Sequence, residues 1–373
     1  MGLDELEVFM ATVNHYLAPV MPFLEDERVT EVMINNFEQI YAEKDGKMVK
    51  CDCKFDDVEA YEAAVNNVLQ FTGKSLADEN PLIDARLPNG SRVHVARPPC
   101  ARFGTVMTIR KFNTTMLDID WLMHLGSFTK EAAEYMQVAV QSERNMLVSG
   151  GTSSGKTSLL NALSAFIPDG ERVVVIEDSA ELQLQQEHVV SLESKPPDEF
   201  GRGAVGIREL FRSSLRLRPD RIIIGEVRGG EALDMIQAMT SGHGGSMGTL
   251  HANNTSDALN RLETLALMSK VELPLHALRG QVASALDVIL QMSRHLGGKR
   301  MITQISEVEP LGDDGHYKLR DIYNLQHVPT ADDPKAMALK WTGLKSNYAN
   351  YLRPGDRELV TELTQNVFEA DDK

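Results

Sequence analysis

The spacing of apolar residues divides the chain into two parts of different character. In the first third, short apolar stretches alternate with turn signals such as Asn89-Gly90, a pattern typical of antiparallel hairpins. Helical spacing predicts two helices in this part, at residues 3–17 and 56–72. The predicted strands cover residues 32–35, 39–43, 48–55, 82–87, 92–95 and 104–110. We therefore predict an N-terminal helix at residues 1–22 and a small α+β domain at residues 23–120.

Beyond residue 145, apolar strands and amphipathic helices alternate. The strands are predicted at residues 146–148, 173–176, 221–226 and 246–251, and the helices at residues 158–163, 207–217, 231–239 and 256–268. This alternation is typical of a parallel sheet covered by helices, so we predict an α/β fold. Residues 288–292 and 301–305 are expected to add an antiparallel pair at one edge of the sheet.

The remaining segments have weaker patterns. We expect a linker at residues 113–121 and a helix at residues 128–141 that leads into the sheet. After residue 310 we expect strands at residues 317–325 and 338–341 and a helix at residues 359–368. On this basis residues 121–310 would form the second domain and residues 311–373 a C-terminal extension.

Net charge, the length of apolar runs and cysteine spacing argue against several classes of protein. The net charge of −16 makes direct binding to nucleic acid or to an anionic membrane improbable. No apolar run approaches the roughly 18 residues that a membrane-spanning helix needs, and residues 1–7 lack the basic start of a signal peptide. Cys51, Cys53 and Cys100 have neither disulfide nor zinc spacing. We therefore expect a cytoplasmic protein with reduced thiols.

The sequence at residues 150–157 fits the phosphate-binding loop, G-x-x-x-x-G-K-[ST]. It stands between a predicted strand and a predicted helix, a context that disfavours the alternative of a chance Gly/Ser-rich loop. Lys156 is expected to reach the β- and γ-phosphates of ATP, and the Thr157 hydroxyl to bind Mg²⁺. The expected nucleotide-binding residues are Gly150, Gly151, Thr152, Ser153, Ser154, Gly155, Lys156, Thr157 and Ser158.

Acidic residues follow two predicted strands, at the ends where parallel sheets bind ligands. Glu226 stands at the Walker B position, and Gly225 occupies the place where many P-loop proteins have Asp. We therefore expect Glu226 to activate water and to contact Mg²⁺ through water; an ordinary helix-start acid is the alternative. Glu177, beside Asp178 and Glu181, is expected near the Mg²⁺ as an outer-sphere group, with helix capping by Asp178 as the alternative.

Two histidines and a set of arginines complete the candidates. His243 and His251 flank a Gly-rich turn, and either imidazole would be able to donate to a terminal phosphate. His251 is the stronger candidate, and a plain hydrogen-bonding role is the alternative for both. Arg86, Arg92 and Arg110 lie on strands of the first domain, where the residues alone favour solvated side chains over a phosphate-binding role.

These motifs resemble those of the secretion ATPases of the type II/type IV traffic superfamily. The similarity covers about residues 32–310. It is carried by residues 84–94, 145–151, 176–178, 181–183, 217–221, 240–244, 249–253, 273–275 and 281–285. The combination is most similar to the CpaF branch, the assembly ATPases of tight-adherence (Tad) pili.

The resemblance implies a homohexamer with a smaller α+β N-terminal domain and a RecA-like P-loop ATPase domain. It implies catalytic roles for Lys156, Glu177, Glu226 and His251. It also implies that Arg92 and Arg110 approach the phosphates from the N-terminal domain. It also implies ATP and Mg²⁺ as substrate and cofactor. The expected partners are pilus platform proteins, which would hold the protein peripherally at the inner face of the bacterial inner membrane.

The sequence departs from the family pattern in two places. Ser153 replaces a glycine of the loop and needs a backbone conformation that a side chain tolerates. The paired zinc-binding cysteines of the type II secretion relatives are absent. We therefore expect a motor for Tad (type IVc) pilus assembly or protein secretion. The alternatives are a type IV secretion or conjugation ATPase, a P-loop phosphotransferase and a non-enzymatic nucleotide-gated scaffold.

Overall fold

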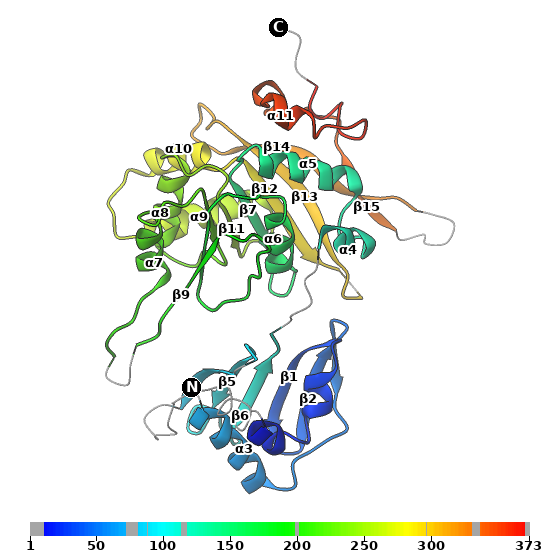
Figure 1. The fold of residues 1–373 in the computed structure, drawn as a ribbon, viewed down its shortest axis with the longest axis vertical. Helices are drawn as coiled ribbons and strands as arrows, with labels where there is room; N and C mark the ends of the chain where they lie inside the picture. Colours follow the sequence, from blue (N-terminus) through cyan, green and yellow to red (C-terminus); the bar gives the residue numbers. More distant parts are fainter. Residues whose placement is uncertain are drawn as a thin grey trace. The chain divides into compact units, whose positions relative to one another are not determined.

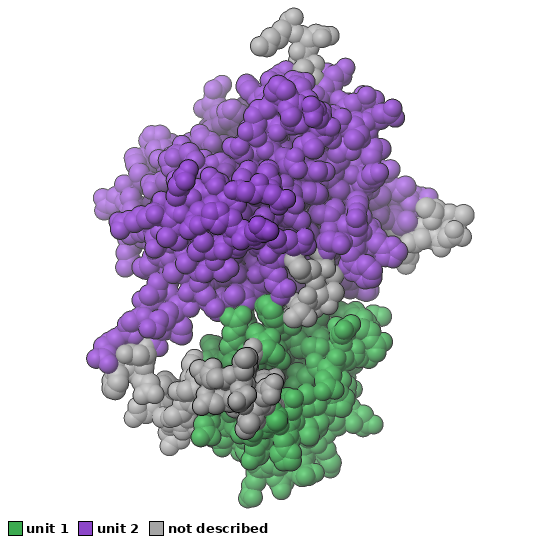
Figure 2. All heavy atoms as spheres, viewed as in Figure 1, with its two compact units in different colours: residues 1–115 green, residues 116–373 purple. Residues whose placement is uncertain are grey.

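A computed structural model describes most of the chain, namely residues 11–71, 81–87, 89–112, 118–197, 201–295, 297–329 and 336–369. The chain divides into two compact units, Met1–Thr115 and Met116–Lys373 (Figure 2). The finer division expected from the sequence, into residues 1–22, 23–120, 121–310 and 311–373, stays a prediction.

Unit 1 is a six-stranded antiparallel sheet with helices packed against it. The strand order is β3-β2-β1-β6-β5-β4. The strands are β1 (Val29–Asn36), β2 (Gln39–Lys44), β3 (Lys47–Lys50), β4 (Leu82–Arg86), β5 (Arg92–Ala96) and β6 (Val106–Arg110). The helices among the described residues are the run 11–16, α2 (Met21–Glu25) and α3 (Val58–Phe71). The first ten residues of the chain, where most of the predicted N-terminal helix falls, lie outside the described residues.

Alternation along the strands explains the core of unit 1. In β1, Val32 and Ile34 are fully buried, and they meet the apolar face of α3 that carries Val65 and Val68. The predicted strand at residues 48–55 is wrong beyond residue 50, because the chain leaves the sheet there and turns Phe55 into the core.

Unit 2 is built on a nine-stranded sheet with the order β15-β14-β13-β12-β7-β11-β10-β8-β9 (Figure 1). Its strands are β7 (Met146–Gly150), β8 (Val173–Glu177), β9 (Val189–Glu193), β10 (Arg221–Ile224), β11 (Met247–Leu250), β12 (Val288–Arg294), β13 (Arg300–Glu309), β14 (Lys318–His327) and β15 (Met337–Trp341). The strands from β12 to β9 pair in parallel, and β13 to β15 extend the sheet in antiparallel fashion. The predicted α/β class is confirmed.

Helices cover both faces of this sheet. One group is α4 (Ile119–His124), α5 (Lys130–Gln141) and α6 (Lys156–Ser164), and the other is α7 (Ile207–Ser214), α8 (Glu231–Met239), α9 (Thr255–Leu267) and α10 (Leu275–Ala285), as Figure 1 shows. In β8, Val173 and Val175 pack toward the first group, and Val174 and Ile176 toward the second. Both faces of the strand are therefore apolar, which explains its unbroken hydrophobic run.

Several elements differ from the prediction. The chain forms α4 within the expected linker, the rest of which (residues 113–117) lies outside the described residues. The short helices α2 and α11 (Pro354–Arg357) were not predicted. Neither were β9 and α10, because β9 is a half-exposed edge strand and α10 contains Gly280. The antiparallel pair of β12 and β13 is confirmed, but β14 and β15 lie beyond it, so it is not at the edge.

The helix predicted at residues 359–368 is wrong, because the segment forms turns instead. Its backbone makes local turn hydrogen bonds, and two of its threonines turn to the buried Glu134 carboxylate on α5. Thr361 donates to Glu134 from its backbone N–H and from its hydroxyl, both at 2.7 Å, and the Thr364 hydroxyl donates to the same carboxylate.

Candidate active site

The phosphate-binding loop joins the end of β7 to the start of α6. Gly150 has no room for a side chain, because an added Cβ would lie 2.5 Å from the backbone oxygen of Met292. Gly155 precedes α6 with a left-handed φ of 96°. Ser153 is also left-handed, at a φ of 56°, a region that a side chain can occupy only at a cost in energy that glycine does not pay. Arg300 Nε donates to the Ser153 carbonyl at 3.1 Å and supports the loop there.

The Lys156 side chain is buried against the loop that carries it. Its Nζ donates to the carbonyl oxygens of Gly150, at 3.1 Å, and Gly151, at 2.9 Å. It also lies 3.3 Å from Nδ1 of His251. Because an ammonium can only donate, Nδ1 of His251 is the acceptor in this contact. Lys156 thus joins the phosphate-binding loop of β7 to the end of the neighbouring strand β11.

A continuous polar chain runs from Lys156 to the Walker B acid. His251 Nε2 lies 3.0 Å from Glu226 Oε1, so the imidazole carries its proton on Nε2 and donates it to the carboxylate. The other oxygen of Glu226 accepts from Arg228 at 2.6 Å. Arg228 also contacts Asp178 at 3.1 Å. These residues follow three neighbouring parallel strands, β11, β10 and β8, whose ends meet at one edge of the sheet.

Sequence reasoning missed Arg228. The sequence shows only that an arginine stands two residues after Glu226. An arginine in such a place is as often a solvated surface charge as a residue of the site. In the structure it bridges Glu226 and Asp178, so it connects the Walker B acid to the acidic cluster that follows β8.

The environment of His251 favours the neutral imidazole. Burial is the largest cause that lowers the pKa of His251 below its ordinary value, followed by the positive charge of Lys156. Glu226 raises this pKa, while Arg228 and Arg261 lower it. Because the net shift is downward, the neutral form with an acceptor at Nδ1 and a donor at Nε2 predominates at pH 7.

Two variants are expected to shift the His251 titration in opposite directions. In Lys156→Ala the pKa of His251 should rise, because a neighbouring positive charge is removed, and in Glu226→Gln it should fall, because a negative charge is removed. NMR titration of the imidazole C–H signals measures both, with His251→Gln to assign the resonance. Shifts of the same sign in the two variants would contradict the contacts described above.

Glu177 explains why position 225 is a glycine. A Cβ on Gly225 would lie 2.8 Å from Cγ of Glu177 on the neighbouring strand β8. Glu177 is buried, and its Oε1 accepts from the backbone N–H groups of Glu181 at 2.9 Å and Leu182 at 3.0 Å, so its side chain cannot easily move. The carboxylate of Glu177 therefore fills the space in which many P-loop proteins place an Asp.

Gly225→Ala should destabilise unit 2 by about 1–3 kcal/mol, since the new methyl group overlaps a held side chain. The melting temperature should fall by roughly 2–12 °C for a unit of this size. Gly280→Ala is the matched control: no atom lies within 4 Å of its added Cβ, and alanine favours the helix in which it stands. Equal melting temperatures for Gly225→Ala and the parent would show that Glu177 does not fill this space.

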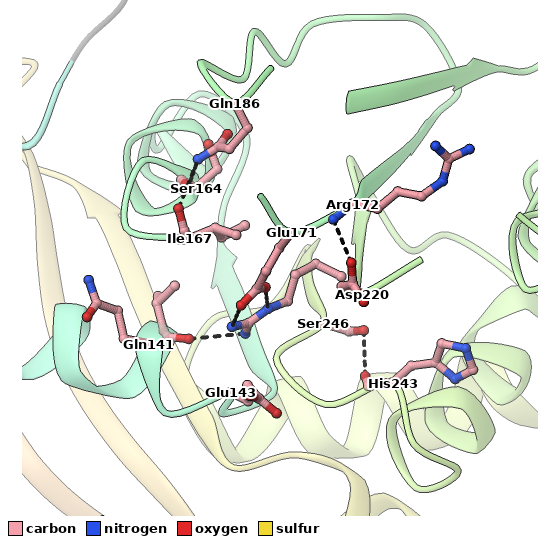
Figure 3. Close-up of polar contacts among 12 residues, drawn as sticks. Gln141, Glu143, Ser164, Ile167, Glu171, Arg172, Gln186, Asp220, His243 and Ser246 are labelled. Carbon is pink, nitrogen blue, oxygen red and sulfur yellow. Dashed lines mark hydrogen bonds and ion pairs between the residues drawn. The ribbon is translucent and has the colours of Figure 1, made fainter. Parts of the chain in front are cut away.

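His243 does not belong to the site. It precedes β11, whereas His251 follows that strand, so the two histidines lie at opposite ends of the sheet. Figure 3 shows the environment of His243, whose carbonyl accepts from the Ser246 hydroxyl at 2.8 Å. The same end of the sheet holds the contact between the Arg172 N–H and Asp220. The expectation that His243 reaches a phosphate is therefore wrong, because the length of β11 separates it from that end of the sheet.

The three arginines of unit 1 form a row across its sheet. Arg86 pairs with Arg92 on β4 and β5, and Arg92 pairs with Arg110 on β5 and β6. Because Val93 is buried, Arg92 lies on the sheet face opposite the core. Glu31 stands opposite Arg110 on β1 and is the acid at the end of this row. Like charges directly across strands are unfavourable, and an anionic ligand would offset that cost.

The donor set of unit 2 fits Mg²⁺ bound together with phosphates. Mg²⁺ takes hard oxygen ligands and usually uses only one or two from the protein, with phosphates and water completing its shell. Thr157 offers a hydroxyl and Glu226 a carboxylate, while no group of three or more His, Cys, Asp or Glu within the described ranges would hold a metal alone. The buried Ser154 hydroxyl has no hydrogen-bond partner in the described chain, as expected of a loop built for a further ligand.

Comparison with known proteins gives a consistent result. A family model described as Type II/IV secretion system protein matches residues 14–315. A putative conjugal transfer protein of Mycobacterium tuberculosis is 32% identical over 291 residues, covering 76% of this chain and 82% of that protein. The type IV secretion system protein VirB11 of Brucella suis is 32% identical over 324 residues, covering 79% and 90%.

The fold is also shared with a solved structure, the ATPase DotB of Legionella pneumophila. That structure has a TM-score of 0.57 at 16% identity, with 95% of this chain and 85% of that chain covered. In the described part of this chain, no helix is both long and apolar enough to cross a membrane. The family match over most of the chain and the two relatives at 32% identity lead to one conclusion: the chain belongs to the type II/IV secretion system protein family, the secretion ATPase superfamily that its motifs resemble.

Proposed function

We propose that this protein is a Mg²⁺-dependent ATPase motor that powers assembly of a Tad (type IVc) pilus, or protein secretion, from the cytoplasmic side of the bacterial inner membrane. The observation that carries the enzymatic part is the chain of contacts from Lys156 through His251 to Glu226. It connects the group that would bind the terminal phosphates to the group that would orient the attacking water.

The contacts suggest how nucleotide would act on the site. In the structure Lys156 donates to two loop carbonyls and to His251. The charged oxygens of a phosphate are stronger acceptors than a carbonyl or an imidazole nitrogen. Binding of a triphosphate would therefore draw Lys156 away from His251. His251 would keep its proton on Nε2 and its contact with Glu226, which holds that carboxylate in place for a water molecule. Bound Mg²⁺, held by Thr157 and through water by Glu226, would supply charge neutralisation at the phosphates.

The mechanical output belongs to the same proposal. The expected assembly is a homohexamer, with pilus platform proteins of the inner membrane as its partners. Arg92 and Arg110 would bind phosphate from unit 1, which would make the closing of the two units depend on nucleotide. The row of like charges across β4, β5 and β6 supports an anion-binding role for that face.

A type IV secretion or conjugation ATPase is the second candidate. The relatives at 32% identity carry the names VirB11 and putative conjugal transfer protein, which favour it. Deletion of the gene in its host separates the two candidates. Loss of surface pili with intact DNA and protein transfer would support the pilus role, and the reverse result would support the transfer role.

A further inference from the structure

Gln291 is a buried polar residue in β12, at a point where the strand is otherwise apolar. It follows the fully buried run at residues 288–290 and is itself only 2% exposed. Burying an amide costs free energy unless its donor and acceptor groups are paired. An apolar side chain of similar size would fill the same space without that cost. The contacts of Gln291 therefore indicate why an amide stands at this position.

The Gln291 amide joins two segments of unit 2 that are distant in the sequence. Its Nε2 donates to the Ala252 carbonyl at 3.2 Å. Its Oε1 accepts from the hydroxyl of Ser149, a fully buried residue near the end of β7. Because a backbone carbonyl can only accept, the contact with Ala252 assigns the NH₂ group to that side and leaves Oε1 for Ser149. A carboxylate of the same length would be unable to donate, so both contacts together require an amide.

Both partners of Gln291 adjoin groups that the proposed reaction uses. Ser149 directly precedes the phosphate-binding loop, and Ala252 directly follows His251. The loop and His251 are therefore connected twice, once through Lys156 and once through Gln291. The phosphates of a bound nucleotide would compete only for the connection through Lys156, because the Gln291 side chain is buried inside the sheet.

We propose that Gln291 is a positioning residue for ATP hydrolysis, one that holds His251 in place when Lys156 turns to the phosphates. This assignment rests on the proposed ATPase function. In that function the ammonium leaves the imidazole, which must still hold the Glu226 carboxylate for water. The hydrogen bond from Gln291 to the carbonyl of Ala252 fixes the backbone next to the imidazole. The other hydrogen bond of the amide ties that backbone to the strand before the loop, so the imidazole and the phosphates keep a fixed separation.

Gln291→Met removes both hydrogen bonds and nearly preserves the side-chain volume. The kcat of ATP hydrolysis should fall about 10-fold, while ATP affinity stays within about twofold, because Lys156 and the loop still bind the phosphates. Steady-state phosphate release and equilibrium binding of ATP, both in Mg²⁺, measure the two quantities. Gln304→Met is the matched control, since Gln304 stands directly opposite Gln291 on β13 and its amide donates to Asp321 instead. The control should keep the parental kcat.

A double-mutant cycle with His251→Ala distinguishes positioning of His251 from general support of the fold. Single-turnover hydrolysis measures the low rates of these variants. Gln291→Met should lower the rate about 10-fold in the parent and less than about twofold in His251→Ala, because the residue it positions is then absent. An equal loss in both backgrounds, or no loss in the parent, would show that Gln291 does not act through His251, and the assignment would be wrong.

Ser149→Ala is the milder variant and keeps the test decisive if Gln291→Met fails to fold. It deletes one hydroxyl and leaves the contact with Ala252, so the rate should fall only about threefold in the parent and stay unchanged in His251→Ala. A parental rate in Ser149→Ala, or the same loss in both backgrounds, would overturn the assignment. If the parent itself releases no phosphate from ATP, the proposed ATPase function is wrong, and the assignment falls with it.

Discussion

Lys156→Ala is expected to reduce ATP turnover by about 10²- to 10³-fold, the size of effect seen when one preorganised donor is removed from a charged transition state. The physical reason is the position of its ammonium. It is buried beside the loop carbonyls of Gly150 and Gly151, where the phosphates would bind, and no other lysine lines the described part of the loop. The measurement is steady-state phosphate release at saturating ATP.

The effect must be separated from damage to the loop. Lys156 also donates to two carbonyls, so its removal leaves them without that donor, and the melting temperature should be recorded together with activity. Lys318→Ala, which removes an exposed lysine from β14, is the control and should keep full activity. Undiminished ATPase activity in a folded Lys156→Ala protein would refute the role given to the phosphate-binding loop.

Glu226→Gln is expected to bind ATP with nearly unchanged affinity and to hydrolyse it about 10²- to 10⁴-fold more slowly, because the amide cannot accept a proton from water. The carboxylate is only 21% exposed and is held by His251 and Arg228, so the group is positioned before any substrate arrives. Single-turnover hydrolysis, together with ATP binding measured on the same preparation, distinguishes loss of chemistry from loss of binding.

A second Glu–Arg pair of the same unit provides the control for this variant. Glu309 contacts Arg320 at 2.8 Å and is 26% exposed, close to the exposure of Glu226. Glu309→Gln removes a comparable ion pair far along the chain from the site and should keep the parental rate. Hydrolysis by Glu226→Gln at the rate of the parent would show that this carboxylate does not activate water.

The sequence was informative where function depends on local pattern. The loop at residues 150–157 was predictable because its glycines, Lys156 and Thr157 are adjacent in the chain. The grouping of Glu226 and His251 was predictable because parallel strands end at a common edge of the sheet. His243 shows the limit of this reasoning, since nearness in sequence to His251 did not reveal that a strand lies between them.

Other features depend on contacts between neighbouring strands, which a single sequence does not show. Gly225 was recognised as a departure from the usual pattern, but its cause is the side chain of Glu177 on β8. Arg228 was missed because its bridge joins Glu226, which follows β10, to Asp178, which follows β8 and stands 50 residues before Arg228 in the chain. The helix predicted near the end of the chain was wrong, and the contact of Thr361 with Glu134 on α5 joins positions far apart in the sequence, which a local pattern does not show.

The most direct test of the account is the release of inorganic phosphate from ATP by the purified protein, with water as the only acceptor, measured in Mg²⁺ and in excess EDTA. We expect steady release in Mg²⁺ and none in EDTA, because the site offers few protein ligands and depends on the metal to neutralise the phosphates. Tight binding of ATP without phosphate release would contradict the account and favour a nucleotide-gated scaffold. Release that appears only after an acceptor is added would contradict it as well and favour a phosphotransferase.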